Sequence, residues 1–372
     1  MFLSQQAKLF LPRRWPCTQL HRPNARQFSS ASLPSTISGA DYLRVSNGKD
    51  QFSALPGRGF LEIEGPEAVK FLQGLTTNQI SRIERGGDGI FAAFLTAQGR
   101  VLYDVFIYPK NRCETFPHPC FVVEHDSRLT QDLMTHLKRY KLRAKLNITN
   151  VSSQFQAYQI WGPNTSRLWG SYLPPMAGAA AKEVGVEPSL PSSFSKANPE
   201  SYTLRRILLG IPEGADDFST GTSLPLESNL DLINGVDFRK GCYLGQELTI
   251  RTYHTGVTRK RIVPVQFYTK EDTCAHPLPS PQTDVTLDQQ QQQETSNAAK
   301  PGRSRRPPSS VGKICSGLHN VGLALMRLDY FGTGDHAGPA LLANNGLLVR
   351  PFAPQWWPQP PEAEGGPAAD AQ

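Results

Sequence analysis

The residues best suited to chemistry lie in one short stretch, KGCYLGQELTIRTYHTG. Within it, Cys242 sits between two glycines, Gly241 and Gly245, just before a run from Gln246 that favours a helix, with Gly256 as the expected stop. The partial positive charge at a helix N-terminus favours the thiolate, which is the nucleophilic and metal-binding form of cysteine. Most free cysteines are instead buried, small apolar side chains. From these residues alone, both interpretations of Cys242 stay open.

Several elements must form around this stretch to hold it. The segment GIFAAFLTAQGRVLYDVFIYP predicts a β-hairpin whose turn carries Gly99 at a positive φ. Apolar periodicity predicts a strand over 60–63, a helix after the turn at Gly65-Pro66, an amphipathic helix over 129–137 and a strand near residue 155.

The first forty residues have the composition of a mitochondrial presequence. No Asp or Glu precedes Asp41, serine is frequent from Ser29 onward, and Arg26-Gln27-Phe28-Ser29 resembles a matrix-protease site. The basic residues of this segment are Lys8, Arg13, Arg14, Arg22 and Arg26. We therefore expect residues 1–28 to be a transit peptide and the mature protein to lie in the mitochondrial matrix. A disordered basic N-terminus without a targeting role is the alternative.

The positive net charge of the chain comes mostly from that leader. The whole sequence has 39 basic and 32 acidic residues, and subtracting the leader's five cations leaves 34 against 32. A nucleic-acid interface needs Lys and Arg clustered on a structured face, so no nucleic-acid partner is expected. No apolar run approaches the roughly 18 residues that a membrane-spanning helix requires, so no membrane span is expected either.

Cysteine usage fits a reducing compartment, where disulfides are rare. Of the six cysteines, one lies in the leader and one in a polar insert. The spacings of Cys113, Cys120, Cys242 and Cys315 match no CxxC zinc motif. We interpret Cys113 and Cys120, which bracket a proline-containing loop, as structural or incidental, and Cys315, in the strand GKICSGL, as part of the core rather than a ligand.

Two polar stretches interrupt the apolar pattern and suggest the domain boundaries. Residues 174–200 are rich in Pro, Ala, Gly and Ser, and residues 270–310 carry five consecutive glutamines beside Pro, Ser and Thr. Neither can bury enough apolar surface to offset its chain entropy, so both are expected to be disordered insertions. The first domain is expected over 41–256 and a small β-barrel over 257–353, followed by a flexible tail over 354–372.

The stretch DLINGVDFRKGCYLGQELTIRTYHTGVTRKR resembles the Lys-Gly-Cys-Tyr-x-Gly-Gln-Glu signature of a group within the aminomethyltransferase, or glycine cleavage T-protein, superfamily. This group comprises the mitochondrial iron–sulfur cluster assembly factors and their bacterial folate-binding relatives. The stretches FLQGLTTNQI, FAAFLTAQGRVLYDVFIY, GIPEG and LPLESNLDLINGVDF resemble the same group. The resemblance runs from about residue 55 to 267 and resumes at VGKICSGLHNVGLALMRL, skipping the two polar stretches.

The resemblance implies an α+β fold of three subdomains around a central funnel that admits tetrahydrofolate, closed by a C-terminal β-barrel. The signature positions are Lys240, Gly241, Cys242, Tyr243, Gly245, Gln246 and Glu247. A thiolate is a soft ligand suited to cluster iron, but one cysteine cannot hold a cluster. The resemblance therefore implies that Cys242 shares an iron–sulfur cluster with an A-type assembly protein. The implied function is maturation of four-iron proteins such as aconitase and lipoate synthase, by protein-dependent cluster handling rather than turnover of a small substrate.

A tetrahydrofolate-dependent aminomethyl transferase is the alternative function. In the true transferases a Leu-Arg-Leu-Glu-Ala-Gly segment supplies a carboxylate that grips the pterin, and the comparable RRILLG here places Leu208 where that glutamate stands. The paired aspartates that follow the hairpin glycines appear as Tyr103 and Asp104, so one survives. A missing carboxylate removes the bidentate hydrogen bonding that orients an aminopterin ring. Weak folate binding can persist without transferase chemistry.

Four residues are candidates for the funnel: Asp104, Glu227, Asn229 and Arg251. Asp104 is either a relic base or a strand-end residue hydrogen-bonded to backbone. Glu227 and Asn229 either contact the ligand or brace the cysteine loop. Arg251, with His254 one turn further on, either faces an anionic ligand or complements the C-terminal dipole of its helix.

Overall fold

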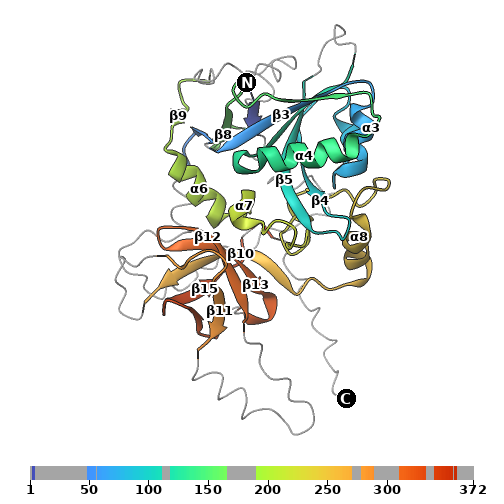
Figure 1. The fold of residues 1–372 in the computed structure, drawn as a ribbon. Coiled ribbons are helices and arrows are strands. Elements are labelled where there is room, and N and C mark those ends of the chain that lie inside the picture. The colour runs from blue at the N-terminus through green and yellow to red at the C-terminus, as the bar shows by residue number, and fades with distance from the viewer. Residues whose placement is uncertain are drawn as a thin grey trace, which may run out of the picture.

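The described strands form two β-sheets and a closed barrel, and Figure 1 shows the barrel below the sheets. The computed structural model describes residues 2–4, 48–55, 57–110, 118–165, 190–269, 278–288, 310–331, 339–354 and 356–357. The helices that connect the sheets to the barrel are α6 (Pro199–Leu208), α7 (Gly214–Asp217) and α8 (Gln246–Thr255). The described residues also form 3₁₀ turns at Ile80–Arg82, Ser127–Leu129 and Leu328–Tyr330.

The larger sheet is antiparallel and has the strand order β4-β5-β6-β3-β7. Its strands are β3 (Arg58–Glu64), β4 (Ile90–Leu95), β5 (Val101–Pro109), β6 (Cys120–Asp126) and β7 (Asn147–Asn150). Because side chains alternate along a strand, Leu61 and Ile63 pack against α3 (Ala68–Leu75) and α4 (Thr130–Lys141), whereas Phe60 packs on the other face. The expected hairpin is present, with Gly99 at φ 78° in its turn.

The smaller sheet covers that other face and has the strand order β1-β8-β2-β9. Its strands are β1 (Phe2–Ser4), β2 (Gln51–Ala54), β8 (Ala157–Trp161) and β9 (Ser195–Lys196). Trp161 is 1 % exposed and belongs to the same core as Phe60. Strand β1 falls within the predicted transit peptide, so removal of the leader would leave β8 at this edge; the remainder of 1–28 lies outside the described residues.

The predicted C-terminal barrel is confirmed. Its strands close in the order β10-β13-β12-β11-β14-β15, which pairs every edge. They are β10 (Lys260–Tyr268), β11 (Asp284–Leu287), β12 (Gly312–Leu318), β13 (Val321–Arg327), β14 (Leu341–Ala343) and β15 (Leu348–Pro351). Val263, Val265 and Phe267 alternate along β10 into the barrel core.

The disorder predicted for residues 174–200 is wrong for residues 190–200. Strand β9 pairs in parallel with β2, and Phe194 is buried beside Phe52. The side chain of Asn198 accepts a hydrogen bond from the backbone N–H of Glu200 (3.0 Å), which caps α6 at Pro199. Residues 166–189 lie outside the described residues.

Two further corrections concern the barrel and the tail. Strand β11 lies inside the stretch 270–310, because Val285 and Leu287 alternate into the barrel core; residues 270–277 and 289–309 lie outside the described residues. The tail predicted to be flexible from Pro354 is still packed at Trp356, whose indole donates to the carbonyl of Leu209 (2.9 Å). Residues 358–372 are not among those described.

Within the part of the chain that the structure describes, no helix combines the length and apolar character needed to cross a membrane.

Candidate functional site

The cysteine loop lies on the surface next to α8. Cys242 is free and exposed, whereas Cys120 and Cys315 are buried. Helix α8 begins at Gln246 and ends before Gly256, as the sequence predicts. Because the thiol faces solvent, the interpretation of Cys242 as a buried apolar side chain is wrong.

Lys240 fixes the start of the loop to the end of α3. Its side chain is buried, and Nζ donates to the carbonyl oxygens of Gln73 (2.8 Å), Thr76 (2.6 Å) and Asn78 (2.8 Å). The same nitrogen lies 4.8 Å from the ring centroid of Tyr243. Burial lowers the pKa of Lys240 to about 7, while three carbonyl acceptors require the ammonium form with its three N–H donors. The signature lysine is therefore a structural anchor of the loop.

Backbone contacts lay the rest of the signature segment along FLQGLTTNQI. The N–H of Leu244 donates to the carbonyl of Gly74 (2.9 Å), and the N–H of Asp237 donates to the carbonyl of Thr77 (3.0 Å). The hydroxyl of Thr77 donates in turn to the carbonyl of Gly235 (2.6 Å). Two stretches about 160 residues apart in the chain thus form one unit under Cys242.

Gly245 ends the loop by packing against the hairpin turn. It caps α8 in the left-handed region, with φ 79°. A Cβ at Gly245 would collide with the carbonyl oxygen of Thr96, and a Cβ at Gly99 would lie 2.8 Å from the carbonyl oxygen of Gly245. Gly241 differs, because its φ lies outside the left-handed region and a Cβ there would meet nothing within 4 Å. Folding therefore requires the second glycine and not the first.

These two glycines make a matched pair of variants. Gly245→Ala is expected to lower the free energy of unfolding by about 2 kcal/mol or more, since it adds left-handed strain to a clash with backbone. Gly241→Ala is expected to change it by less than about 0.5 kcal/mol. Urea denaturation of both variants measures this difference, and equal losses would contradict the packing described for Gly245.

The remaining signature residues divide between loop and surface. The N–H of Tyr243 donates to Oε1 of Gln246 (3.1 Å), and the N–H of Gln246 donates back to the carbonyl of Tyr243 (3.2 Å). This reciprocal pair rigidifies the turn into α8. Glu247 is exposed and forms an ion pair with Arg251 one helical turn on (2.7 Å). Arg251 therefore faces solvent paired with Glu247.

The four residues expected to line the funnel do not come together. Asp104 lies in the middle of β5, not at a strand end, and its carboxylate accepts the N–H of Gly214 at 3.1 and 3.2 Å. Asn229 is fully buried, and its side-chain amide donates to the carbonyl of Ile262 (2.6 Å), bracing the barrel. Glu227 is half-buried beside α8, and Arg251 lies on the surface.

Asp104 belongs to a buried group of charges that the sequence did not reveal. Arg58 contacts Glu124 (3.0 Å) and Glu213 (3.1 Å), and Arg206 contacts Glu213 (3.5 Å) and also pairs with Asp217. We call this group the Arg58 cluster; its members are Arg58, Asp104, Glu124, Arg206, Glu213 and Asp217. Its four carboxyl groups outnumber its two guanidinium groups, so the Arg58 cluster favours the protonated form of one carboxyl. Among the stretches that carry the family resemblance, GIPEG contains Glu213 and Gly214, but its sequence does not indicate that Glu213 is part of a buried cluster.

Asp104 is the member of the Arg58 cluster expected to hold that proton. Burial raises its pKa to about 6 against the opposing charge of Arg58. A carboxyl whose pKa is raised by folding stabilises the protein below its unfolded pKa near 4, and that contribution is lost as the pH rises through 6.

Asp104→Asn should therefore stabilise the protein at neutral pH, because the amide oxygen still accepts the Gly214 N–H and no buried charge forms. We expect a gain of about 1 to 3 kcal/mol at pH 7.5 that shrinks towards zero near pH 4. Urea denaturation at both pH values measures the difference. A difference that does not vary with pH would show that Asp104 does not titrate in this range.

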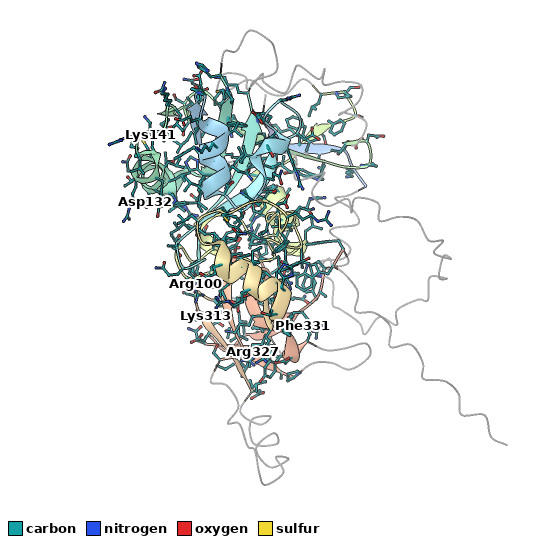
Figure 2. The ribbon with its side chains drawn as sticks, turned by 90° about the vertical axis from the view of Figure 1, so that its right-hand side faces the viewer. Arg100, Asp132, Lys141, Lys313, Arg327 and Phe331 are labelled. Carbon is teal, nitrogen blue, oxygen red and sulfur yellow. The ribbon has the colours of Figure 1, made fainter. Side chains whose placement is uncertain are left out.

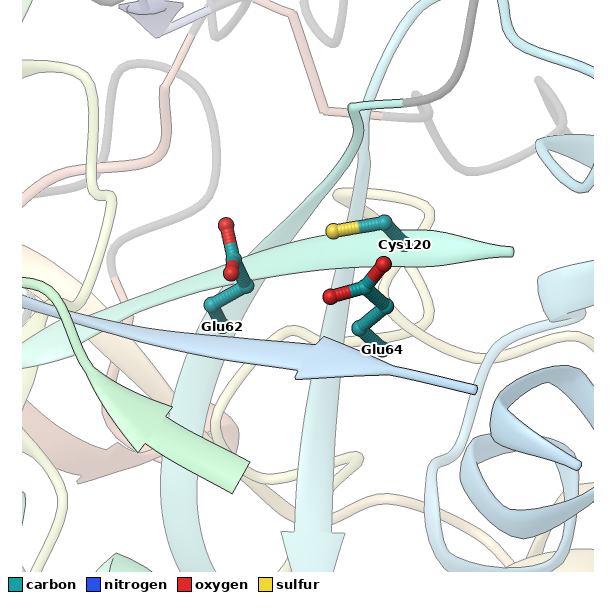
Figure 3. A group of neighbouring side chains, drawn as sticks. All are labelled: Glu62, Glu64 and Cys120. Atoms are coloured by element: carbon teal, nitrogen blue, oxygen red, sulfur yellow. The ribbon is translucent and has the colours of Figure 1, made fainter. Parts of the chain in front are cut away.

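A second group of side chains has the composition of a metal site. Figure 3 shows Glu62, Glu64 and Cys120, whose ligand atoms lie within 4.8 Å of one another. Glu64 stands opposite Cys120 in the β3–β6 pairing. Lys110 forms an ion pair with Glu62, and burial raises the pKa of Cys120 to about 12, which keeps the thiol protonated. Lys110 thus balances the charge of Glu62, and the protonated, buried Cys120 agrees with the structural role expected for it.

The other cysteines add no exposed thiol among the residues described. Cys315 is buried beside Ile262 and Leu323, and burial raises its pKa. This agrees with the expected place in an apolar strand. Cys113 lies outside the described residues.

Two domain families and one solved structure define the class of protein. Residues 57–178 match the GCVT N-terminal domain, and residues 259–359 match the CAF17 C-terminal β-barrel domain. The crystal structure of the glycine cleavage system aminomethyltransferase T from Bartonella henselae superposes with a TM-score of 0.56, covering 86 % of this chain and 90 % of that one. At 12 % identity this likeness shows the fold alone. The chain has the aminomethyltransferase-like α+β fold with a C-terminal barrel, as predicted.

Sequence relatives identify the family within that class. Three proteins each named "iron–sulfur cluster assembly factor IBA57 homolog, mitochondrial" match most of the chain. The one from Mycosarcoma maydis is 34 % identical over 83 % of this chain and 85 % of its own length. Those from Neurospora crassa and Pyricularia oryzae are 37 % and 40 % identical, over 84 % and 75 % of this chain and 76 % and 72 % of their own lengths. The chain belongs to this family of mitochondrial iron–sulfur cluster assembly factors.

The residues present do not fit the pterin grip of the aminomethyltransferases, although the fold is shared. Leu208, which replaces the glutamate, is 2 % exposed and packs among Ile207, Ile262 and Leu323. Asp104 is already committed to the Gly214 N–H within the Arg58 cluster. Neither position therefore offers a free carboxylate to a pterin ring.

Proposed function

We propose that this protein acts in the mitochondrial matrix as an iron–sulfur cluster assembly factor and that Cys242 is its ligand to a cluster shared with a partner. The observation that carries the proposal is the exposure of this thiol, which is the only exposed one of the three cysteines that the structure describes. Thiolates are the usual ligands of cluster iron. The family relatives are named as mitochondrial cluster assembly factors.

The loop that carries Cys242 is already ordered in the free protein. Lys240 on one side and Gly245 on the other are fixed by buried contacts, while Cys242 between them is open to solvent. A loop that is already ordered loses little conformational freedom when a partner binds. The absence of a side chain at Gly241 leaves room for a partner's backbone beside the thiol.

The partner must supply the other ligands, because a cluster needs about four and Cys242 provides one. We propose an A-type iron–sulfur assembly protein as that partner and four-iron enzymes such as aconitase and lipoate synthase as clients. Arg239 is exposed on the segment that carries Cys242, three residues before the thiol. An exposed cation there favours approach of a partner surface that carries carboxylates.

Depletion of the protein in its own cells tests this function. Aconitase activity and protein lipoylation should fall together, while the activity of a mitochondrial two-iron protein should be retained, because only four-iron assembly depends on the shared cluster. Retained aconitase activity and lipoylation after full depletion would refute the proposal. A fall in the two-iron protein as well would place the chain at an earlier, general step.

A further inference from the structure

A pocket lies beneath α8, on the side of the helix that faces the barrel. It has a volume of about 300 Å³. Its lining residues come from α8, from the segment 224–227, from the segment 257–260 that leads into β10, and from Arg327 at the end of β13. Figure 2 shows α8 in front, with Arg327 of the barrel below it. The α8 pocket shares no lining residue with the Arg58 cluster. Of the four residues expected in the funnel, the pocket contains only Glu227.

One buried polar atom of a lining residue, Nε of Arg327, has no hydrogen-bond partner among the described residues. Buried polar groups are normally paired, and leaving one unpaired costs about 1 to 3 kcal/mol. Arg327 therefore retains an N–H donor that no described residue of the protein satisfies.

The charges of the wall favour an anion. Arg259, Lys260 and Arg327 line the pocket, against a single carboxyl, that of Glu227. The ion pair of Arg327 with the exposed Asp329 is 3.6 Å long and leaves Nε unpaired. Burial raises the pKa of Glu227, and the charges of Lys260 and Arg100 oppose that shift.

The opposite wall is apolar. Leu226 and Leu248 line the pocket, and Val257 at its mouth is 77 % exposed. Thr249 is the only buried residue of α8, so the helix covers this hollow with little packing of its own. A bare inorganic anion would leave that apolar wall uncovered, whereas an aliphatic chain would remove it from water.

We propose that the α8 pocket binds a small organic anion, with a carboxylate on Arg327 and Lys260 and an aliphatic part against Leu226 and Leu248. Glutarate, which has two carboxylates joined by three methylenes, is a probe of the right chemistry. Inorganic phosphate is the matched probe without an aliphatic part.

Calorimetric titration of the purified full chain tests the proposal. Glutarate should bind saturably and about tenfold more tightly than phosphate, because only glutarate covers the apolar wall. Absence of saturable heat up to a concentration on the order of 20 mM would overturn the site. Phosphate affinity equal to that of glutarate would overturn the organic part of the proposal.

Two variants that remove the same charge locate the binding. Arg327→Gln should weaken glutarate about tenfold, the effect of one charge-assisted hydrogen bond, whereas Arg251→Gln on the exposed face of α8 should change it less than twofold. Equal weakening by both would mean that net charge alone attracts glutarate. If Arg327→Gln lacks a cooperative melting transition, Lys260→Gln provides the test, with several-fold weaker binding expected and unchanged binding counting against the pocket. Cys242→Ser should bind glutarate normally, which separates this site from the proposed cluster ligand.

Discussion

Cells whose only copy of the protein carries Cys242→Ser are expected to have no more aconitase activity than cells without the protein. The structure gives two reasons for so large an effect. Cys242 is the exposed thiol on a loop otherwise fixed by buried contacts, and a serine hydroxyl is a poor ligand for cluster iron. Because the side chain is exposed, the free energy of unfolding should change by no more than about 0.5 kcal/mol. Aconitase activity and urea denaturation of the same variant measure the two effects.

Cys315→Ala is the matched control for loss of a thiol. Cys315 is buried in the barrel, so its replacement should cost about 1 kcal/mol of stability while leaving aconitase maturation intact. Normal aconitase activity with Cys242→Ser would remove the basis for a shared cluster at this position. Loss of activity with both variants at equal protein levels would show that the effect is not specific to the exposed thiol.

Lys240→Met is expected to have the largest effect on stability. Methionine reaches about as far as the lysine Cε but donates no hydrogen bond, so the carbonyls of Gln73 and Thr76 lose the Lys240 donor and that of Asn78 keeps only the Thr76 hydroxyl (3.2 Å). Each buried acceptor left unpaired costs about 1 kcal/mol or more, which predicts a loss of about 3 to 5 kcal/mol. Urea denaturation measures this loss.

Lys70→Met on α3 is the control, because Lys70 is exposed and makes none of these contacts. It should lie within about 0.5 kcal/mol of wild type. If the two methionine variants were equally stable, Lys240 would not be the anchor of the loop, and its place in the signature would need a role at the surface.

The parts of the site that follow from local sequence were predictable. Gln246 to Thr255 favours a helix and Gly256 cannot extend it, and both boundaries match the structure of α8. The same is true of the hairpin with Gly99, because a turn glycine between two apolar runs is a short-range signal. The exposure of Cys242 was not predictable, since a cysteine between glycines suits a surface and a core equally well.

The parts that depend on distant contacts were missed. Lys240 is held by carbonyls more than 160 residues earlier in the chain, so nothing beside it in the sequence indicates its burial. The Arg58 cluster likewise joins β3, β5, β6, α6 and α7. Strand β11 was hidden by the polar residues around it, because only the barrel gives Val285 and Leu287 a surface to cover.

The central claim is that Cys242 is a ligand of a cluster shared with a partner. The most direct test is to mix the purified mature chain, without oxygen, with the A-type assembly protein of the same organism carrying a two-iron cluster. Size exclusion with visible absorbance would then be compared for wild type and Cys242→Ala. A coloured complex of both proteins that forms with wild type and not with Cys242→Ala is the predicted result. A coloured complex with both, or with neither, would contradict the assignment of Cys242 as the ligand.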